Sequence, residues 1–246
     1  MLIDTHCHLH DQGFFTPEQQ SEFLDAAHSR GVEKIICIGT DPDDSKVAAD
    51  FARSHENVFW TFGIHPEFAS KNYQLPSTNN LLTSPKKPVA IGEIGLDYHY
   101  APYDRSAQIK LFEQMLQLAL NLNLPVSLHI REAFADAFAV LANFPTLHGV
   151  VHSFTGSKRE LKQALDQGFY IGVNGLATYT TPPLPPLDHI LLETDAPFLT
   201  PVPFRGTINQ PGYVALVATY LAGKMGVAEL EIMEQTTQNA TNLFQI

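Results

Sequence analysis

The sequence contains little cysteine, little basic charge and no long apolar run. Its two cysteines, Cys7 and Cys37, cannot form a framework of several disulfides. Both lie in segments with the pattern of buried strands, which fits a reducing cytoplasm. No apolar run approaches the roughly 20 residues that span a bilayer, and no signal peptide precedes the first strand. We therefore expect a cytoplasmic protein with no membrane partner.

Acidic residues outnumber basic ones. The chain has 26 Asp and Glu against 15 Lys and Arg, a formal net charge of -11 and a pI of about 5.3. This balance argues against capture of nucleic acid by a broad basic surface. It leaves nucleic acid open as a substrate, because bound cations could neutralise an acidic mouth locally.

What the sequence does contain is a regular alternation of strands and helices. Its 246 residues, 44% of them hydrophobic, are enough for one sizeable core. Short apolar runs predict eight strands that are buried on both faces. These runs are Leu2–His6, Lys34–Gly39, Val58–Gly63, Val89–Glu93, Val126–His129, Gly149–Ser153, Phe169–Val173 and Ile190–Asp195. Helices are expected at Pro17–Arg30, Asp43–Ser54, Asp104–Leu122, Glu132–Asn143, Ser157–Gln167, Gly212–Lys224 and Val227–Gln238.

Alternating strands and helices predict an α/β fold with a parallel sheet and right-handed crossovers, and eight such strands indicate a (β/α)8 TIM barrel. We find no internal repeat and no linker, so residues 1–246 should form a single domain. Two crossovers are irregular. The helix within Tyr73–Lys87 should be short or poor, and the four prolines of Thr178–Asp188 forbid an ordinary helix. A loop should therefore replace the seventh crossover helix.

The first strand runs into an Asp-x-His-x-His motif. Alternate side chains of a strand point to the same face, so His6 and His8 should project together, with Asp4 behind them. Two imidazoles aimed at one point make half of a metal site.

Other strand ends carry similar chemistry. Five of the strands place a histidine or carboxylate at the carboxyl end, where functional residues of such barrels gather. Each residue alone has a structural alternative: a strand-end histidine can be a hydrogen-bonded core group, and a carboxylate can cap a helix or form an ion pair. We assign structural roles to Asp97 and Asp4, although Asp4 could also orient a metal ligand. The candidates at the strand ends are His65, Glu93, His129, His152 and Asp195.

The chain resembles the TatD family of metal-dependent hydrolases, within the amidohydrolase-like barrels. The matching stretches cover the chain from end to end in the expected order. They are Ile3–His8, Gly63–Pro66, Gly92–Asp97, His129–Ala133, His152–Gly156, Glu193–Pro197 and Arg205–Gly206 followed by Asn209 and Pro211.

The resemblance implies a site for two divalent metal ions. His6 and His8 would hold one ion with Asp195, His129 and His152 would hold the other, and Glu93 would bridge both. Such a pair of ions can clamp the attacking and leaving oxygens of a phosphoryl displacement. The resemblance also implies that Asp195 takes the proton of the attacking water. The implied contacts to phosphate are His65 and Arg205.

Three functions remain in competition at this point. The first is a deoxyribonuclease, a 3'-5' exonuclease-like phosphodiesterase acting on DNA or another phosphodiester, single-stranded or at ends. The second is an amidohydrolase-type enzyme for an amide, lactone or phosphotriester. Relatives of that type often use a modified lysine where this chain has Glu93, which favours the first. The third is a metal-binding protein without turnover. The ligand types admit Mg, Mn or Zn, and the oligomeric state is not readable.

Two departures from the family pattern bear on substrate preference. Many relatives carry a second histidine after Gly-x-His-Pro, where this chain has Glu67, so a phosphate contact should be missing. The proline-rich Thr178–Asp188 segment should leave the eighth strand, and with it Asp195, less rigidly supported. Neither departure touches the six expected ligands, so we expect activity to be retained.

Overall fold

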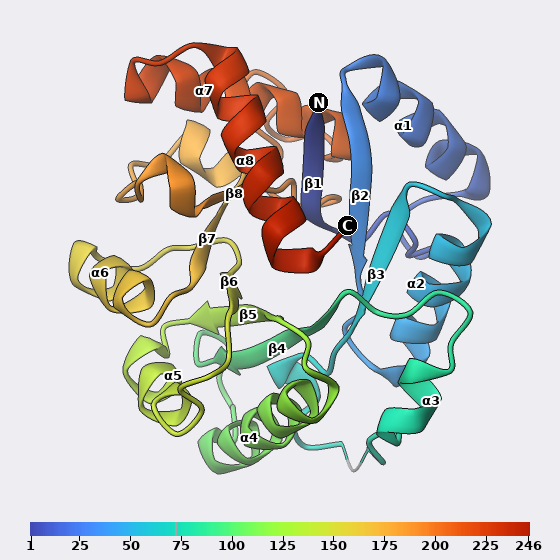
Figure 1. Ribbon diagram of the computed structural model, residues 1–246, viewed down its shortest axis with the longest axis vertical. Helices are drawn as coiled ribbons and strands as arrows, with labels where there is room; N and C mark the ends of the chain where they lie inside the picture. The colour runs from blue at the N-terminus through green and yellow to red at the C-terminus, as the bar shows by residue number, and fades with distance from the viewer. Residues whose placement is uncertain (72) are drawn as a thin grey trace.

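The computed structural model describes residues 1–71 and 73–246, and its centre is one sheet of eight parallel strands in sequence order (Figure 1). Each strand pairs with the next along the chain, which confirms the predicted (β/α)8 barrel. The strands are β1 (Leu2–Cys7), β2 (Val32–Ile38), β3 (Val58–Phe62), β4 (Ala90–Asp97), β5 (Val126–Arg131), β6 (Gly149–Val151), β7 (Tyr170–Val173) and β8 (Ile190–Leu192).

Helices surround the sheet on the outside (Figure 1). They are α1 (Pro17–Ser29), α2 (Pro42–Ser54), α3 (Thr78–Leu82), α4 (Arg105–Leu122), α5 (Phe134–Leu141), α6 (Lys158–Asp166), α7 (Val214–Met225) and α8 (Glu229–Phe244). Four short 3-10 turns accompany them: η1 (Pro66–Phe68), η2 (Gly175–Thr178), η3 (Leu187–His189) and η4 (Pro211–Tyr213).

Polar side chains fix where several helices begin. Thr16 and Gln19 form a reciprocal capping box at α1, and Ser157 and Glu160 form another at α6. Asp41 accepts from the first backbone N–H groups of α2. Because each cap lies close in sequence to its helix, the sequence alone places these starts well.

The barrel closes between its first and last strands. The backbone N–H of Asp195 donates to His6 O at 2.8 Å, and the N–H of His8 donates to Ala196 O at 2.8 Å. Cys7 and Ala196 form a parallel bridge at the same place. The two chain segments that carry three of the expected ligands are therefore joined by backbone hydrogen bonds.

Helix α8 covers the amino-terminal ends of the strands. Its Thr237 hydroxyl donates to Met1 O, and its Asn239 amide donates to Ile190 O, both at the start of a strand. In Figure 1 this helix crosses the barrel end that faces the viewer. Apolar side chains inside the barrel pack against this helix in one cluster. The cluster consists of Ile3, Ile36, Ile38, Ala90, Val150 and Leu191 from the strands and Ala240, Leu243 and Phe244 from α8. The opposite, carboxyl-terminal end is the one left open for a site.

Several element ends differ from the sequence prediction. The last helix runs on to Phe244 instead of ending at Gln238, because its later residues remain buried against the barrel. The helix expected from Glu132 begins at Phe134, since Glu132 has a φ of 55°, outside the helical region. The strand expected to reach Asp195 ends at Leu192. Asp195 lies beyond it in a left-handed backbone conformation, with a φ of 59°.

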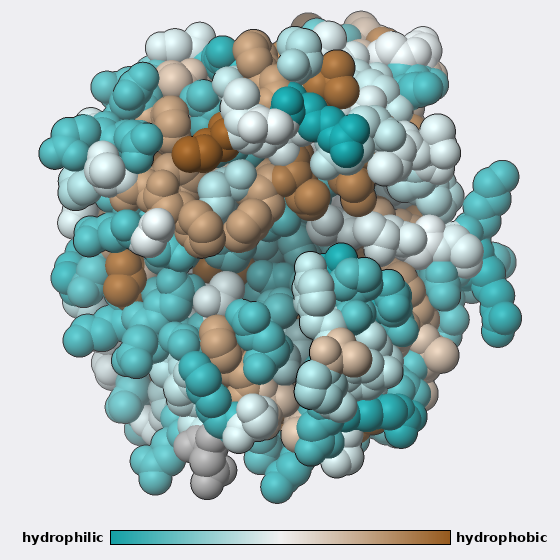
Figure 2. Space-filling model, turned by 180° about the vertical axis from the view of Figure 1, so that it is seen from behind, coloured by the Kyte–Doolittle hydropathy of each residue, from teal (hydrophilic) through white to brown (hydrophobic). Residues whose placement is uncertain are grey.

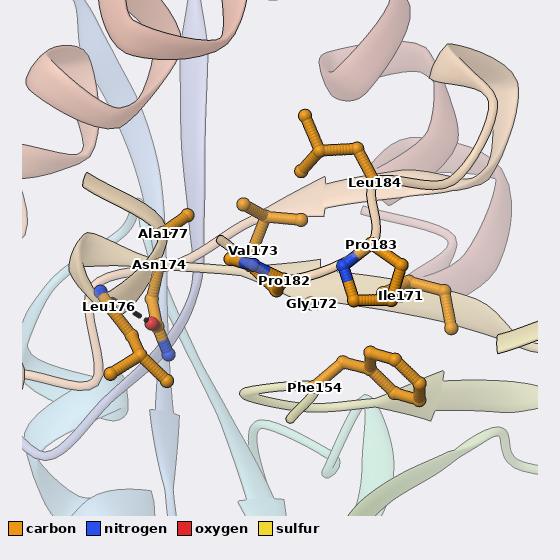
Figure 3. A pocket seen from close by; sticks show the side chains of 10 residues that line it. All are labelled: Phe154, Ile171, Gly172, Val173, Asn174, Leu176, Ala177, Pro182, Pro183 and Leu184. Atoms are coloured by element: carbon orange, nitrogen blue, oxygen red, sulfur yellow. Dashed lines mark hydrogen bonds between the residues drawn. The ribbon is translucent and has the colours of Figure 1, made fainter. Parts of the chain in front are cut away.

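The proline-rich segment forms no α-helix, as predicted. Pro182, Pro183 and Leu184 line a small pocket together with Phe154 and Ile171, and in Figure 3 the ring of Pro183 lies beside Ile171. Leu184 and Leu187 of this segment are partly buried against the apolar core, so the loop contributes packing although it is not helical.

Among the described residues, no single helix is long and apolar enough to cross a membrane. Residues Pro211–Met225 and Glu229–Phe244 meet the length and composition criteria only together, as a pair bent by 115°.

Candidate metal centre

Glu93 lies at the centre of the carboxyl-terminal end of the barrel, on β4. Its carboxylate is 2.8 Å from His129 Nδ1, 3.1 Å from His152 Nε2 and 3.5 Å from His6 Nε2. Burial alone would raise the pKa of Glu93, but the charge of His152 and the hydrogen bonds from His129 and His152 hold it well below its ordinary value. Glu93 is therefore a buried carboxylate that stays ionised.

A glycine at the end of β3 makes room for Glu93. A Cβ atom at Gly63 would lie 2.2 Å from the backbone nitrogen of Glu93. That nitrogen donates to Gly39 O at 2.9 Å. Only glycine permits this approach, so the Gly-x-His-Pro motif serves the site through its glycine as well as through its histidine.

His6, His8 and Asp195 meet at the closure of the barrel. Asp195 Oδ1 is 3.5 Å from His6 Nε2 and 3.7 Å from His8 Nε2. The other ring nitrogen of His8 is 3.1 Å from Ile38 O, which fixes the orientation of the ring. The structure thus brings the two histidines of the first strand together with the aspartate of the last.

Asp4 holds the end of β8 in place. Its carboxylate accepts from the backbone N–H of Thr194 at 2.9 Å and from the Thr194 hydroxyl at 2.6 Å. It also accepts from the backbone N–H of His6 at 3.3 Å. Asp4 is fully buried and touches no ligand ring, so it positions the backbone on either side of the closure.

Two carboxylates that the sequence interpretation left without a site role contact the histidines from behind. Asp97 Oδ2 is 2.9 Å from His129 Nε2, and Glu193 Oε1 is 3.4 Å from His152 Nδ1. The structural role expected for Asp97 is not tested by this contact, which makes Asp97 a candidate for orienting the His129 ring as well. A signal was available: Asp97 follows Glu93 by four residues on one strand, an even spacing that places both side chains on the same face.

The donor atoms are close enough to hold cations. In each of four groups, the ligand atoms lie within 4.8 Å of one another. Neither ring nitrogen of the buried His6 has a hydrogen-bond partner among the described residues, as expected for a side chain that awaits a ligand. Imidazole and carboxylate donors suit Zn, Mn and Mg. The groups are His6, His8 and Glu93; His6, His152 and Asp195; Glu93, His129 and His152; and His65, Asp97 and His129.

The two expected substrate contacts lie in different positions. His65 Nε2 is 3.9 Å from Glu93 Oε1, and its ring centroid is 4.5 Å from that of His129. Burial lowers the pKa of His65 to about 4, so the ring is neutral at pH 7. Arg205 lies on the exposed loop after β8, with its guanidinium 4.2 Å from the ring centroid of Tyr179, and does not line the central cavity.

The site opens into a broad cavity of about 1410 Å³ that reaches Glu93, His129, His152 and Asp195. Figure 2 shows this face of the molecule, hollowed near its centre, with apolar side chains gathered mainly above and to the left of the hollow. The volume is ample for a nucleotide, since pockets for small ligands measure about 300–1,000 Å³. A parallel eight-stranded barrel with buried histidines and carboxylates at the carboxyl ends of its strands defines an enzyme of the (β/α)8 class.

Comparison with known proteins places the chain within this class. Residues 3–245 match the family TatD related DNase, and the chain belongs to that family. It is 34% identical over 256 residues to the metal-dependent hydrolase YabD of Bacillus subtilis, with both chains covered in full. It is 35% identical to the 3'-5' ssDNA/RNA exonuclease TatD of Pantoea vagans, covering 89% of this chain and 91% of that protein.

The fold also matches a solved structure closely. The TatD homologue YJJV of Escherichia coli superposes with a TM-score of 0.89 at 30% identity, over 100% of this chain and 98% of that chain. The resemblance derived from the motifs is therefore confirmed at the level of family and fold.

Proposed function

We propose that this protein is a divalent-metal-dependent deoxyribonuclease that removes nucleotides from single-stranded ends in the 3'-5' direction. The observation that carries the proposal is the convergence of four histidines and Asp195 around Glu93 at the open end of the barrel. Family membership supports hydrolysis of a phosphodiester, and the exonuclease TatD of Pantoea vagans supports the polarity and the single-stranded substrate.

The proposed ligands follow the geometry. His6, His8 and Asp195 would hold one cation, His129 and His152 a second, and Glu93 would bridge the two. Cations bound there would supply positive charge that activates a water molecule and stabilises charge developing on the phosphate.

Asp195 is the proposed general base. Its pKa lies below its ordinary value, because the nearby His8 ring and the charges of His152 and His6 outweigh the effect of burial, so it is ionised at pH 7. It borders the cavity, where it can accept the proton of an attacking water. Asp4 and Thr194 hold the backbone of this turn, so the carboxylate keeps its direction through the proton transfer.

His65 and Arg205 are proposed to contact the phosphate. The neutral His65 borders the cavity beside Glu93 and can donate one hydrogen bond to a phosphate oxygen. Arg205 can reach the phosphate of a neighbouring nucleotide from the rim, because its side chain is exposed.

An Asp195→Asn substitution tests the proposal. We expect at least a roughly 100-fold loss of kcat on a single-stranded oligonucleotide, by removal of the base. The matched control is Asp25→Asn, on the exposed face of α1. Labelling the 5' end gives a ladder of shortened products if digestion starts at the 3' end. An Asp195→Asn variant with full metal content and full rate would remove Asp195 from the mechanism.

The same purified protein separates the competing functions. It is assayed with added Mg, Mn or Zn on an oligonucleotide, a lactone and an amide. Turnover of the lactone or amide alone would assign an amidohydrolase-type enzyme. Metal uptake without turnover of any substrate would assign a binding protein.

A further inference from the structure

Exposed apolar side chains gather at the open end of the barrel. On this face, Figure 2 shows apolar side chains gathered above the hollow. Most of the large hydrophobic residues that are exposed in the described chain belong to the loops after β1, β4 and β8, at the carboxyl-terminal end of the barrel. They are Phe14, Tyr100, Tyr103, Phe198, Val202, Phe204 and Ile208. Four of them, Phe14, Tyr100, Tyr103 and Phe198, line the cavity, and an apolar lining there indicates that an apolar part of a ligand binds against it.

Phe14 and Phe198 form a pair within this lining, which we call the aromatic wall. Their ring centroids are 5.3 Å apart with an interplanar angle of 80°, and each residue is 47% exposed. The Phe198 ring is 6.3 Å from the ring of His8. Both phenylalanines line the central cavity. The wall therefore stands directly beside one of the proposed metal ligands.

The backbone beneath the aromatic wall is firmly held. The N–H of Phe198 donates to Asp195 O at 2.8 Å, and its carbonyl accepts from the Asn209 amide at 2.6 Å. Next to Phe14, Phe15 is fully buried and anchors the loop. An exposed ring on a fixed backbone is ready to bind without reordering, which reduces the entropic cost of binding.

The charges around the cavity give a reason for such a wall. Five acidic residues line the cavity besides the proposed ligands, whereas Arg131 is the one Arg or Lys among its described lining residues. Phosphates of a nucleic acid therefore find little attraction outside the metal centre. Stacking of bases on aromatic rings supplies binding energy that does not depend on charge. The acidic residues are Asp11, Asp44, Glu67, Asp97 and Asp104.

We propose that a nucleobase beside the phosphodiester that is cleaved stacks on the face of Phe198 and contacts Phe14 at its edge, since the two rings are nearly perpendicular. This inference rests on the proposed nuclease function. Because phenylalanine offers no hydrogen bond to a base edge, the wall should accept every base and should reject a nucleotide that lacks one. A base held in a duplex does not expose its face, so the wall also selects single-stranded ends.

Kinetics with and without the base provide the first test. The substrates are a single-stranded oligonucleotide, the same oligonucleotide with abasic terminal residues, and methyl p-nitrophenyl phosphate. We expect Phe198→Ala to lower the ratio of kcat/KM for the oligonucleotide to that for the small phosphodiester roughly 10-fold, through KM. Phe198→Tyr should restore the ratio. The preference of the wild type for base-bearing over abasic ends should disappear in Phe198→Ala.

Phe204→Ala is the matched control. Phe204 is an exposed aromatic residue on the same loop, but its ring stacks on Tyr213 at 4.9 Å and does not line the cavity. We expect this variant to keep the wild-type ratio. Equal losses in Phe204→Ala and Phe198→Ala would overturn the proposal, since the effect would then belong to the loop as a whole.

A binding measurement separates this proposal from the proposed function. An oligonucleotide with 2-aminopurine at its end and phosphorothioate linkages is added to the metal-loaded protein. Stacking should quench its fluorescence in the wild type and not in Phe14→Ala/Phe198→Ala. Equal quenching in the wild type and the double variant would overturn the proposal that the aromatic wall binds a base. A wild-type protein that cleaves no oligonucleotide would instead overturn the proposed nuclease function. If the wild-type protein self-associates and the double variant does not, the surface binds a second copy of the chain, and the proposal is overturned.

Discussion

Glu193 and His152 form a buried pair behind the metal centre. Glu193 Oε1 is 3.4 Å from Nδ1 of His152, whose other ring nitrogen lies 3.1 Å from Glu93. The same oxygen accepts from the backbone N–H of Ser153 at 2.7 Å and from the Asn174 amide at 3.1 Å. A carboxylate in this position orients a ligand imidazole and increases its basicity.

Replacing Glu193 by Gln should weaken the metal centre. The neutral amide keeps the size of the side chain but removes the charge that faces His152, and losses of roughly 10–100-fold in metal affinity or activity are typical of such changes. Metal affinity is measured by competition with a chelator. Glu231→Gln, an exposed residue of α8, is the control. Unchanged affinity in Glu193→Gln would show that His152 does not depend on this pair.

Gly172→Ala should disturb the same pair from β7. A Cβ atom at Gly172 would lie 2.3 Å from Glu193 Oε2, so the carboxylate must move or the strands must separate. Overpacking of this kind costs roughly 1–3 kcal/mol of folding free energy. Urea unfolding measures the loss. Gly223→Ala is the control, because a Cβ atom at this position on α7 would meet nothing within 4 Å and alanine favours a helix.

Metal affinity should increase with pH. Burial alone would lower the pKa of His152, but the charges of Glu93 and Glu193 raise it well above its ordinary value. Burial would also lower the pKa values of His8 and His129. Asp195 instead raises the pKa of His8, and Asp97 together with Glu93 raises the pKa of His129. A group with a raised pKa keeps its proton to higher pH, so an entering cation must displace protons. Calorimetry in buffers of different ionisation enthalpy counts them, and zero release at pH 7 would show that these histidines are already neutral without metal, which contradicts the prediction.

The same shifts predict how pH affects the metal-free protein. Protonation of these three histidines stabilises the fold fully below the ordinary histidine pKa of about 6.5, and the contribution is lost as pH rises through the raised values. The metal-free protein should therefore be less stable to urea at alkaline pH, and saturating metal should remove most of this dependence. Stability that instead increases with pH over this range would contradict the prediction.

Binding of single-stranded DNA should depend weakly on salt. Arg131 lines the cavity and Arg205 lies on the rim, so few phosphates can be neutralised by side chains. For one or two such contacts, the slope of log K against log salt is about -0.7 to -1.4. Fluorescence anisotropy at a fixed saturating concentration of the divalent ion measures it. A slope several times steeper would contradict the prediction, because it would require contacts from many more Lys or Arg side chains.

Local patterns determined most of the fold. Short apolar runs placed all eight strands, and the helices expected between them lie close to the observed ones, because both kinds of element depend on residues within a few positions of one another. The four prolines before β8 excluded a helix for an equally local reason. The Asp-x-His-x-His motif likewise set His6 and His8 on one face of β1. Helix α8 was predicted too short, since its last turns are stabilised by the barrel and not by their own sequence.

The partners of the site residues depended on the tertiary structure. Closure of the barrel brings Asp195 to His6 and Asp4 to Thr194, about 190 positions apart in the chain, and no local pattern encodes that contact. The same holds for Glu193 behind His152 and for the meeting of Phe14 with Phe198. The sequence by itself determined which residues could serve chemistry at the strand ends. Only the closed barrel decided which of them touch, because contact between distant segments is set by the packing of the whole sheet.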